Sequence, residues 1–225
     1  MLRAWVGVLL AGSGALMVGA SSQRWGGVCS LASAVGGELT DACALRTDHD
    51  FEFLPPVDPW LPVGSSAQLA GWSLVVLAVA LVLLPWALTG RRPGHVTAVA
   101  LAAAGLAALA MGVATIRSGA SGVVVAPVLG AVTMQVWLLL PPAVLVVLAV
   151  GARGWARASA ILLVLAAPLV ALFSYAVGPW DAQPWWEGMS GTLAVAAGLS
   201  LLVAAVRQHP AGEATQVEST VPSYA

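Results

Sequence analysis

The residues best suited to chemistry lie in the stretch RTDHDFEFLPPVDPWLP, residues 46–62. Acidic side chains alternate there with one imidazole and two aromatic rings, in the order Asp48, His49, Asp50, Phe51, Glu52 and Phe53. Carboxylate oxygen and imidazole nitrogen both bind divalent metal ions. A two-residue period, however, is typical of a strand, in which neighbouring side chains point to opposite faces. Asp48 and His49 therefore cannot readily meet on one ion, and we interpret the stretch as a solvated acidic face with no metal site.

Four prolines follow and shape the connection of this stretch to the rest of the chain. They are Pro55, Pro56, Pro59 and Pro62. Proline lacks a backbone donor and disfavours helix in the residue before it, so this segment should adopt extended or turn geometry. We expect the two phenylalanines to turn towards the helix ends or the membrane, and Trp60 to lie near the lipid headgroups.

A second loop, GPWDAQPWWEG at residues 178–188, concentrates tryptophan. Its tryptophans could form a ligand platform, but tryptophan beside a membrane usually anchors the chain at the interface. Together the two loops supply the candidates for an outer-surface binding site. These are Asp48, His49, Asp50, Glu52, Trp60, Trp180, Trp185 and Trp186.

Two cysteines, Cys29 and Cys43, precede the acidic stretch in the same loop, with thirteen residues between them. Redox centres more often carry Cys-x-x-Cys, which this chain lacks. In an oxidising compartment such a pair forms a structural bridge, and closing a loop of this size contributes roughly 3 kcal/mol in the chain-entropy model. We therefore predict a Cys29–Cys43 disulfide.

The composition shows what must position these loops. Of the 225 residues, 60% are hydrophobic and only 8% are charged. A soluble domain carries about 25% charged residues to cover its surface. Most of this surface must therefore face something other than water, and we expect an integral membrane protein.

Six apolar stretches have the length needed for membrane-spanning helices, about 20 residues each. They cover residues 1–20, 69–88, 96–116, 134–150, 159–177 and 191–206. Outer segments are expected at 21–68, 117–133 and 178–190, inner loops at 89–95 and 151–158, and a disordered polar tail at 207–225. The predicted fold class is all-α: a polytopic bundle of six transmembrane helices with a disulfide-closed outer loop.

The fourth span lies within a longer apolar run, and two residues near its start indicate where it begins. Gln135 and Trp137 are placed at headgroup level, where an indole finds apolar contacts and a hydrogen-bond partner. Residues 120–132 then form a surface-lying or shallow re-entrant segment. Pro141 and Pro142 fall inside the span and should kink the helix, with neighbouring helices compensating, or with a hinge as the alternative.

Arginine positions predict the orientation, because short loops rich in arginine stay in the cytoplasm. With six spans, one side carries six arginines: Arg3, Arg91, Arg92, Arg153, Arg157 and Arg207. The other side carries three arginines against eight acidic residues. We expect both termini in the cytoplasm and, from the bias towards Ala, Gly, Val, Arg and Trp, a bacterial plasma membrane.

Residues 1–20 also have the charged start, apolar core and small-residue cleavage site of a signal peptide. Cleavage would leave five spans and an unchanged orientation for the rest. Against cleavage, small side chains recur every four residues at Gly7, Ala11, Ala15 and Gly19, a pattern that lets another helix approach closely. We expect the first helix to be retained, with cleavage as the alternative.

Chemistry inside the membrane is disfavoured. Beyond Arg3 at the start, the predicted spans contain no Asp, Glu, His, Lys or Arg, the groups that proton relays, ion-coupled transport and intramembrane catalysis use at depth. We therefore expect neither an ion-coupled transporter nor an enzyme, and we assign no catalytic residue, metal or cofactor.

Two function classes remain. The first is a non-enzymatic structural or accessory protein whose outer loops contact a partner, and the small-residue helix faces and proline-rich loop favour it. The alternative is a binder or passive carrier of an apolar small molecule entered from the outer face, which a cavity between helices would support. The expected partners are the lipid bilayer and another membrane protein or a second copy of the chain, with no nucleic acid.

Overall fold

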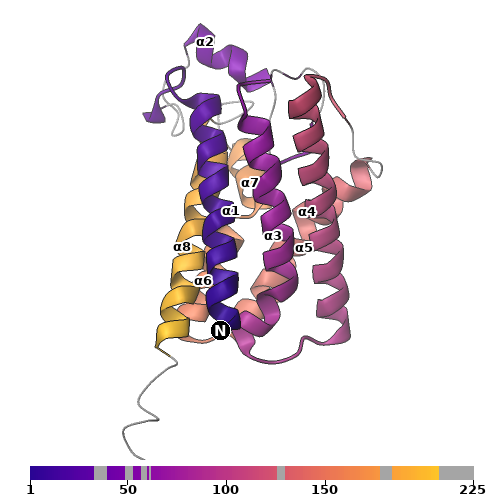
Figure 1. Ribbon diagram of the computed structural model, residues 1–225, viewed down its shortest axis with the longest axis vertical. Coiled ribbons are helices and arrows are strands. Elements are labelled where there is room, and N and C mark those ends of the chain that lie inside the picture. Colours follow the sequence, from indigo (N-terminus) through magenta and orange to yellow (C-terminus); the bar gives the residue numbers. More distant parts are fainter. Residues whose placement is uncertain are drawn as a thin grey trace, which may run out of the picture.

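The computed structural model describes residues 1–32, 40–48, 53–56, 60, 62–125, 130–177 and 184–207 (Figure 1). Every regular element in these ranges is a helix, so the all-α prediction is confirmed. The elements are α1 (Leu2–Trp25), α2 (Asp41–Ala44), the 3-10 helix η2 (Leu45–Asp48), α3 (Ser66–Thr89), α4 (His95–Ser121), α5 (Gly130–Gly151), α6 (Gly154–Leu165), α7 (Pro168–Val177) and α8 (Trp186–Val206).

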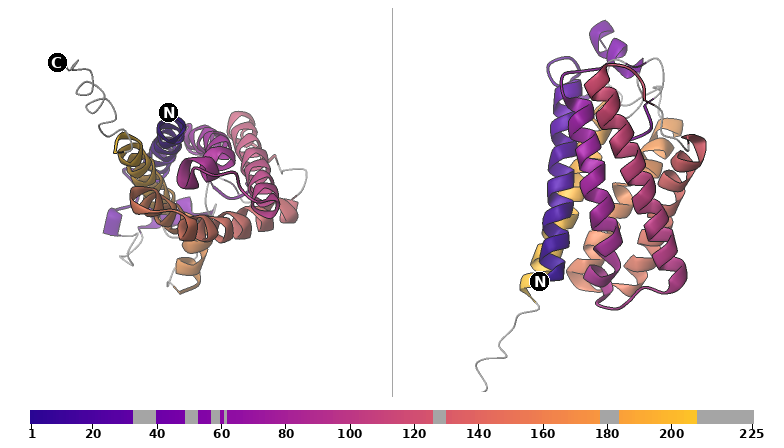
Figure 2. Two further views of the ribbon diagram at one scale, coloured as in Figure 1. Left: turned by 90° about the horizontal axis from the view of Figure 1, so that it is seen from below. Right: turned by 45° about the vertical axis from the view of Figure 1, so that its right-hand side comes forward.

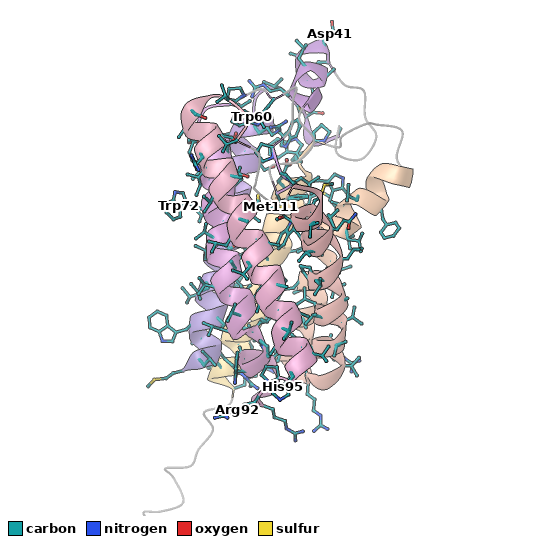
Figure 3. All side chains as sticks on the ribbon, turned by 90° about the vertical axis from the view of Figure 1, so that its right-hand side faces the viewer. Asp41, Trp60, Trp72, Arg92, His95 and Met111 are labelled. Carbon is teal, nitrogen blue, oxygen red and sulfur yellow. A yellow bond between two sulfur atoms is a disulfide. The ribbon has the colours of Figure 1, made fainter. Side chains whose placement is uncertain are left out.

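Five of these helices are long and apolar enough to cross a membrane: α1, α3, α4, α5 and α8. They run for 21 to 27 residues, which at 1.5 Å per residue matches a hydrocarbon core of about 30 Å. Large apolar side chains such as Trp72 project from the outside of the bundle (Figure 3). The chain thus has the helices of a membrane protein.

The fifth predicted span, residues 159–177, is not one helix. Helix α6 ends at Leu165 and α7 begins at Pro168, so neither piece reaches the length of a span. Pro168 has no amide hydrogen and its ring would clash with the carbonyl four residues earlier. The carbonyl of Val164 instead accepts a bond from the amide of Ala167, at 3.2 Å. Of the six predicted spans, five are therefore found as long helices, and the remaining one is divided into the two short helices α6 and α7.

The helices form a closed ring when viewed along the bundle (Figure 2). Each packs against its neighbours in the order α1, α3, α4, α5, α6 and α8, and α8 returns to α1. Helix α7 has few contacts with this ring and projects outside it (Figure 2, left). The break at Pro168 therefore changes the course of the chain and separates α7 from α8.

Glycines bring two pairs of antiparallel helices into backbone contact. A Cβ atom on Gly191 of α8 would lie 2.7 Å from the carbonyl oxygen of Gly14 in α1, and one on Gly112 of α4 would lie 2.7 Å from that of Gly71 in α3. The predicted small-residue face of the first helix is thus used inside the chain. Its register differs from the prediction, because Ala15 is exposed and Gly14 makes the contact.

The structure also describes the surroundings of the fourth predicted span. Trp137, expected at headgroup level, is 2% exposed and packs in the core of the bundle. Helices occupy both ends of the segment predicted outside the membrane, 117–133, because α4 continues to Ser121 and α5 begins at Gly130; residues 126–129 lie outside the described ranges. Helix α5 also continues through its two prolines. The residues of the tail beyond Arg207 are likewise outside the described part of the chain.

Candidate functional site

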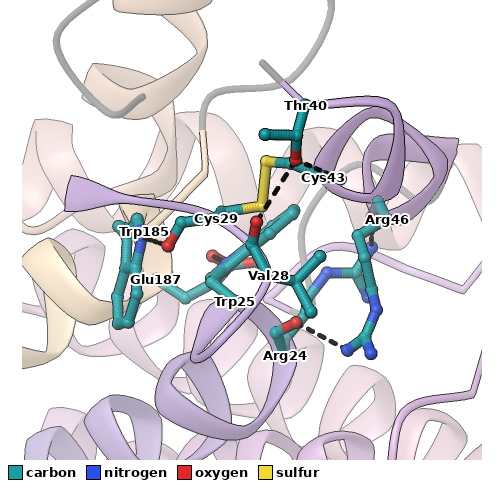
Figure 4. The surroundings of a disulfide bond; sticks show 9 residues. All are labelled: Arg24, Trp25, Val28, Cys29, Thr40, Cys43, Arg46, Trp185 and Glu187. Carbon is teal, nitrogen blue, oxygen red and sulfur yellow. Dashed lines mark hydrogen bonds between the residues drawn. A yellow bond between two sulfur atoms is a disulfide. The ribbon is translucent and has the colours of Figure 1, made fainter. Parts of the chain in front are cut away.

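The predicted disulfide is present and closes a small cluster at one end of the bundle, here called the disulfide end (Figure 4). Cys29 and Cys43 have Cα atoms 5.0 Å apart. Both cysteines are buried and pack with Trp25, the last residue of α1. The hydroxyl of Thr40 accepts a bond from the amide of Cys43 at 3.2 Å and so caps α2. The bridge therefore ties α2 to the end of α1.

Two buried charged residues lie beside this bridge. Glu187, in the first turn of α8, is fully buried, and its Oε2 accepts a bond from the indole Nε1 of Trp25 at 2.9 Å. The guanidinium of Arg24, 1% exposed, lies over the ring of Trp25 at 4.8 Å. A cation and a carboxylate are thus held by one indole, and the N-terminus of α8 further favours a carboxylate there.

Arg24 also connects the end of α1 to η2 through hydrogen bonds. Arg24 donates from Nη2 to the carbonyl of Arg46 in η2, and Arg46 donates from Nη1 to the carbonyl of Arg24, each at 2.8 Å. Trp185 donates from Nε1 to the carbonyl of Cys29 at 3.2 Å. Hydrogen bonds and the disulfide therefore join segments that are far apart in the sequence: α1, α2, η2 and the start of α8.

The structure places the predicted surface residues as follows. Trp185 joins the disulfide cluster, and Trp186 packs against the main core. Trp60 is half-buried at the disulfide end (Figure 3). Asp48 ends a 3-10 helix, so residues 45–48 do not begin the expected strand. His49, Asp50, Glu52 and Trp180 lie outside the described residues.

The loop after the acidic stretch reaches into the bundle through Phe53. This ring is 3% exposed and belongs to the main core, as predicted for a phenylalanine turned towards the helices. Its carbonyl accepts a bond from the indole Nε1 of Trp137 at 2.9 Å. The indole donor of Trp137 is thus satisfied inside the protein, as is usual for a buried tryptophan.

A cavity of about 60 Å³ lies beneath Phe53, between α1, α3, α5, α6 and α8. One water molecule needs roughly 10–15 Å³ on a comparable measure, so the space admits a group larger than water. Two proline sites form part of its wall: Pro141 in α5, and Pro168 with Ala166 and Ala167 at the break between α6 and α7. The break between α6 and α7 therefore forms part of the cavity wall.

The lining is apolar except for a few hydroxyl groups. Ser13 and Ser73 hydrogen-bond to each other's backbone carbonyls, at 2.9 and 2.8 Å, so both hydroxyls are satisfied between α1 and α3. Ser190 of α8 also lines the cavity. No titratable side chain appears among the described residues of the wall. Such a wall suits an apolar molecule with at most one or two polar atoms.

Sequence reasoning missed the buried Glu187 and the cavity. Glu187 follows two tryptophans and was counted only as an acid on the outer side. A carboxylate at the start of an apolar helix was the available signal, since acidic residues favour that position. The cavity had one signal, the pair Pro141 and Pro142 inside a span.

The chain matches no protein-family model, no curated protein sequence and no solved structure at a significant level.

Proposed function

We propose that this protein is a non-enzymatic binder or passive carrier of a small apolar molecule, held in the cavity beneath Phe53. The observation that carries the proposal is the helix break at residues 166–168 lining that cavity. Irregular backbone at membrane depth is costly unless it is buried in protein or lines a cavity. Membrane transporters use such discontinuous helices to form substrate sites.

The accessory role predicted from the sequence has less support. It relied on small-residue helix faces that could receive a partner, but Gly14 and Gly71 are already in contact with α8 and α4. The outer loop is likewise engaged, because Arg46 and Trp185 bond within the chain. Contact between the outer loops and a second membrane protein stays a prediction.

We also propose the orientation and location expected from the arginines. The end opposite the disulfide, here called the arginine end, carries Arg3, Arg91, Arg92 and Arg153 and would face the cytoplasm of a bacterium. The disulfide end would then lie in the oxidising compartment, where the Cys29–Cys43 bridge persists. A ligand would enter from that outer side, between Phe53 and α7.

A photoreactive ligand tests the proposed function. The purified protein in detergent is illuminated with a diazirine derivative of octanol, and the labelled residues are identified by peptide mass spectrometry. We expect label on the cavity wall around residues 166–168. Ala194→Leu should abolish it, because the larger side chain fills the space.

The matched control is Ala196→Leu, which makes the same change on the same helix. Ala196 is half-buried and does not line the cavity, so this variant should keep the label on residues 166–168. Label confined to the lipid-facing surface, or equal loss in both variants, would refute the cavity as a binding site.

A further inference from the structure

A second, polar pocket lies at the arginine end of the bundle. It has a volume of about 540 Å³, within the range of roughly 300–1,000 Å³ found for ligand pockets. Four arginines from three segments line it: Arg3 in the first turn of α1, Arg91 and Arg92 between α3 and α4, and Arg153 between α5 and α6. We call these four residues and their surroundings the arginine pocket.

The positive charge of this pocket is not neutralised within the described chain. The described residues at this end of the bundle include no aspartate or glutamate, and none of the four arginines forms an ion pair with a described residue. Like charges that are gathered without a counter-ion repel one another. An anion bound among them would remove that repulsion.

The rim of the pocket has a defined structure, because specific hydrogen bonds fix it. Arg3 donates from Nε to the carbonyl of Ala87 in the last turn of α3, at 2.7 Å. The hydroxyl of Thr89 donates to the carbonyl of Pro85 at 2.8 Å and accepts from the amide of Arg91 at 3.2 Å. Gly90 takes the left-handed conformation that ends α3, with φ of 69°. The turn that carries Arg91 therefore has a defined course.

Position and shape indicate the class of ligand. Gly94 and Thr97, at the start of α4, line the pocket, and the first amides of a helix have no partner within it. Val147, 60% exposed, and Leu148 of α5 form the apolar part of the wall. Guanidinium groups pair with phosphate oxygens through two parallel bonds, and an apolar wall beside them suits an acyl chain. Basic pockets between membrane helices bind anionic lipid headgroups in this way.

We propose that the arginine pocket binds a phosphate group, supplied by the headgroup of an anionic phospholipid or by soluble phosphate. Arg91 and Arg153 contact the phosphate from the two opposing links, and Arg3 orders the turn between α3 and α4. This site is separate from the apolar cavity, and neither proposal depends on the other.

Lipid binding to the full chain tests the proposal. The protein in a non-ionic detergent is titrated with phosphatidylglycerol, with phosphatidylcholine and with inorganic phosphate, and bound lipid is counted by native mass spectrometry while phosphate is followed by calorimetry. We expect phosphatidylglycerol to bind more tightly than phosphatidylcholine. The double variant Arg91→Gln/Arg153→Gln should lose roughly tenfold or more in affinity, since bonds to charged groups contribute about 1.5–3 kcal/mol and 1.4 kcal/mol is tenfold.

The control removes two positive charges at the same end of the bundle, but from residues outside the pocket. Arg157→Gln/Arg207→Gln should bind phosphatidylglycerol as the unmodified chain does, because Arg157 and Arg207 are exposed and do not line the pocket. If inorganic phosphate binds with the same dependence on Arg91 and Arg153, and competes with the lipid, the source is soluble phosphate.

Equal losses in the two double variants, or no loss in either, would overturn the proposal, because binding would then follow net charge alone. Thermal melting without added phosphate checks the fold of each variant. Where the pocket double variant fails to fold, Arg91→Gln alone is compared with Arg157→Gln alone under the same criteria.

Discussion

Glu187 is a fully buried acidic side chain. A carboxylate taken out of water is strongly destabilising unless hydrogen bonds and opposite charges replace its solvation. Trp25 donates one such bond, the N-terminus of α8 supplies a favourable dipole, and Arg24 lies on the face of the same indole. Three residues from the two ends of the sequence thus stabilise each other where the loops meet.

The indole donor can be removed by itself. Trp25→Phe keeps an aromatic ring beside Cys29 and Cys43 but removes the bond to Glu187. The unfolding free energy should fall by about 1–3 kcal/mol, the range for a buried acceptor that loses its donor. Unfolding in mixed micelles of detergent and denaturing surfactant measures it.

Trp72→Phe is the control for that substitution, because Trp72 is 54% exposed on the outer face of α3. Its effect should stay within about 0.5 kcal/mol. A Trp25→Phe effect no larger than this value would mean that the bond does not stabilise the disulfide cluster.

At the scale of the helices, close backbone approach replaces large interlocking side chains. Gly7 and Gly14 of α1 face Gly198 and Gly191 of α8, so successive contacts are seven positions apart in each helix. Lipid tails are as apolar as leucine, so burying leucine provides little drive for helix association in a membrane, whereas close packing at small residues does. The pairing of α1 with α8 closes the ring that encloses the cavity.

A single methyl group should open this pairing. The Cβ atom of Gly14→Ala would collide with the carbonyl oxygen of Gly191 and the amide of Val195. Backbone atoms cannot move aside cheaply, so we expect a loss of about 1–3 kcal/mol or more in unfolding free energy. The same unfolding assay in mixed micelles measures it.

Gly12→Ala is the matched control on the same helix, two residues away. A Cβ atom on Gly12 has no neighbour within 4 Å, and alanine is favoured over glycine in a helix by about 1 kcal/mol. This variant should be neutral or slightly more stable. Destabilisation of both variants to the same extent would contradict the packing of α1 against α8.

The whole molecule is asymmetric from end to end. The disulfide end holds the bridge and the buried pair Arg24 and Glu187, whereas the arginine end presents exposed positive side chains such as Arg92 (Figure 3). The proposed orientation places the first end outside the cell and the second in the cytoplasm. The two proposed sites would then face opposite compartments, with the apolar cavity nearer the outside.

Reporter fusions at the two ends of α4 test this orientation. A fusion after Arg92 should behave as cytoplasmic, and a fusion after Gly122, which ends the same helix, should behave as external. The physical reason is the retention of arginine-rich links on the cytoplasmic side. The reverse pattern would invert the orientation of the bundle, and identical signals at both positions would mean that α4 does not span.

The sequence alone determined the properties that depend on local composition and length. Apolar runs of about 20 residues predicted the five long helices, and the presence of Cys29 and Cys43 in one predicted outer loop predicted the bridge. Both inferences need only residues that are close in the chain.

Only the tertiary structure could show the features that depend on how neighbouring helices pack. The chain remains helical through Pro85, Pro141 and Pro142 but breaks at Pro168, because a proline in a membrane helix can be compensated by the helices packed around it. The burial of Trp137 also depends on a distant part of the chain, since its donor finds the carbonyl of a residue 84 positions away. The cavity lies between the faces of five helices, so the proline pair in α5 could not by itself reveal it.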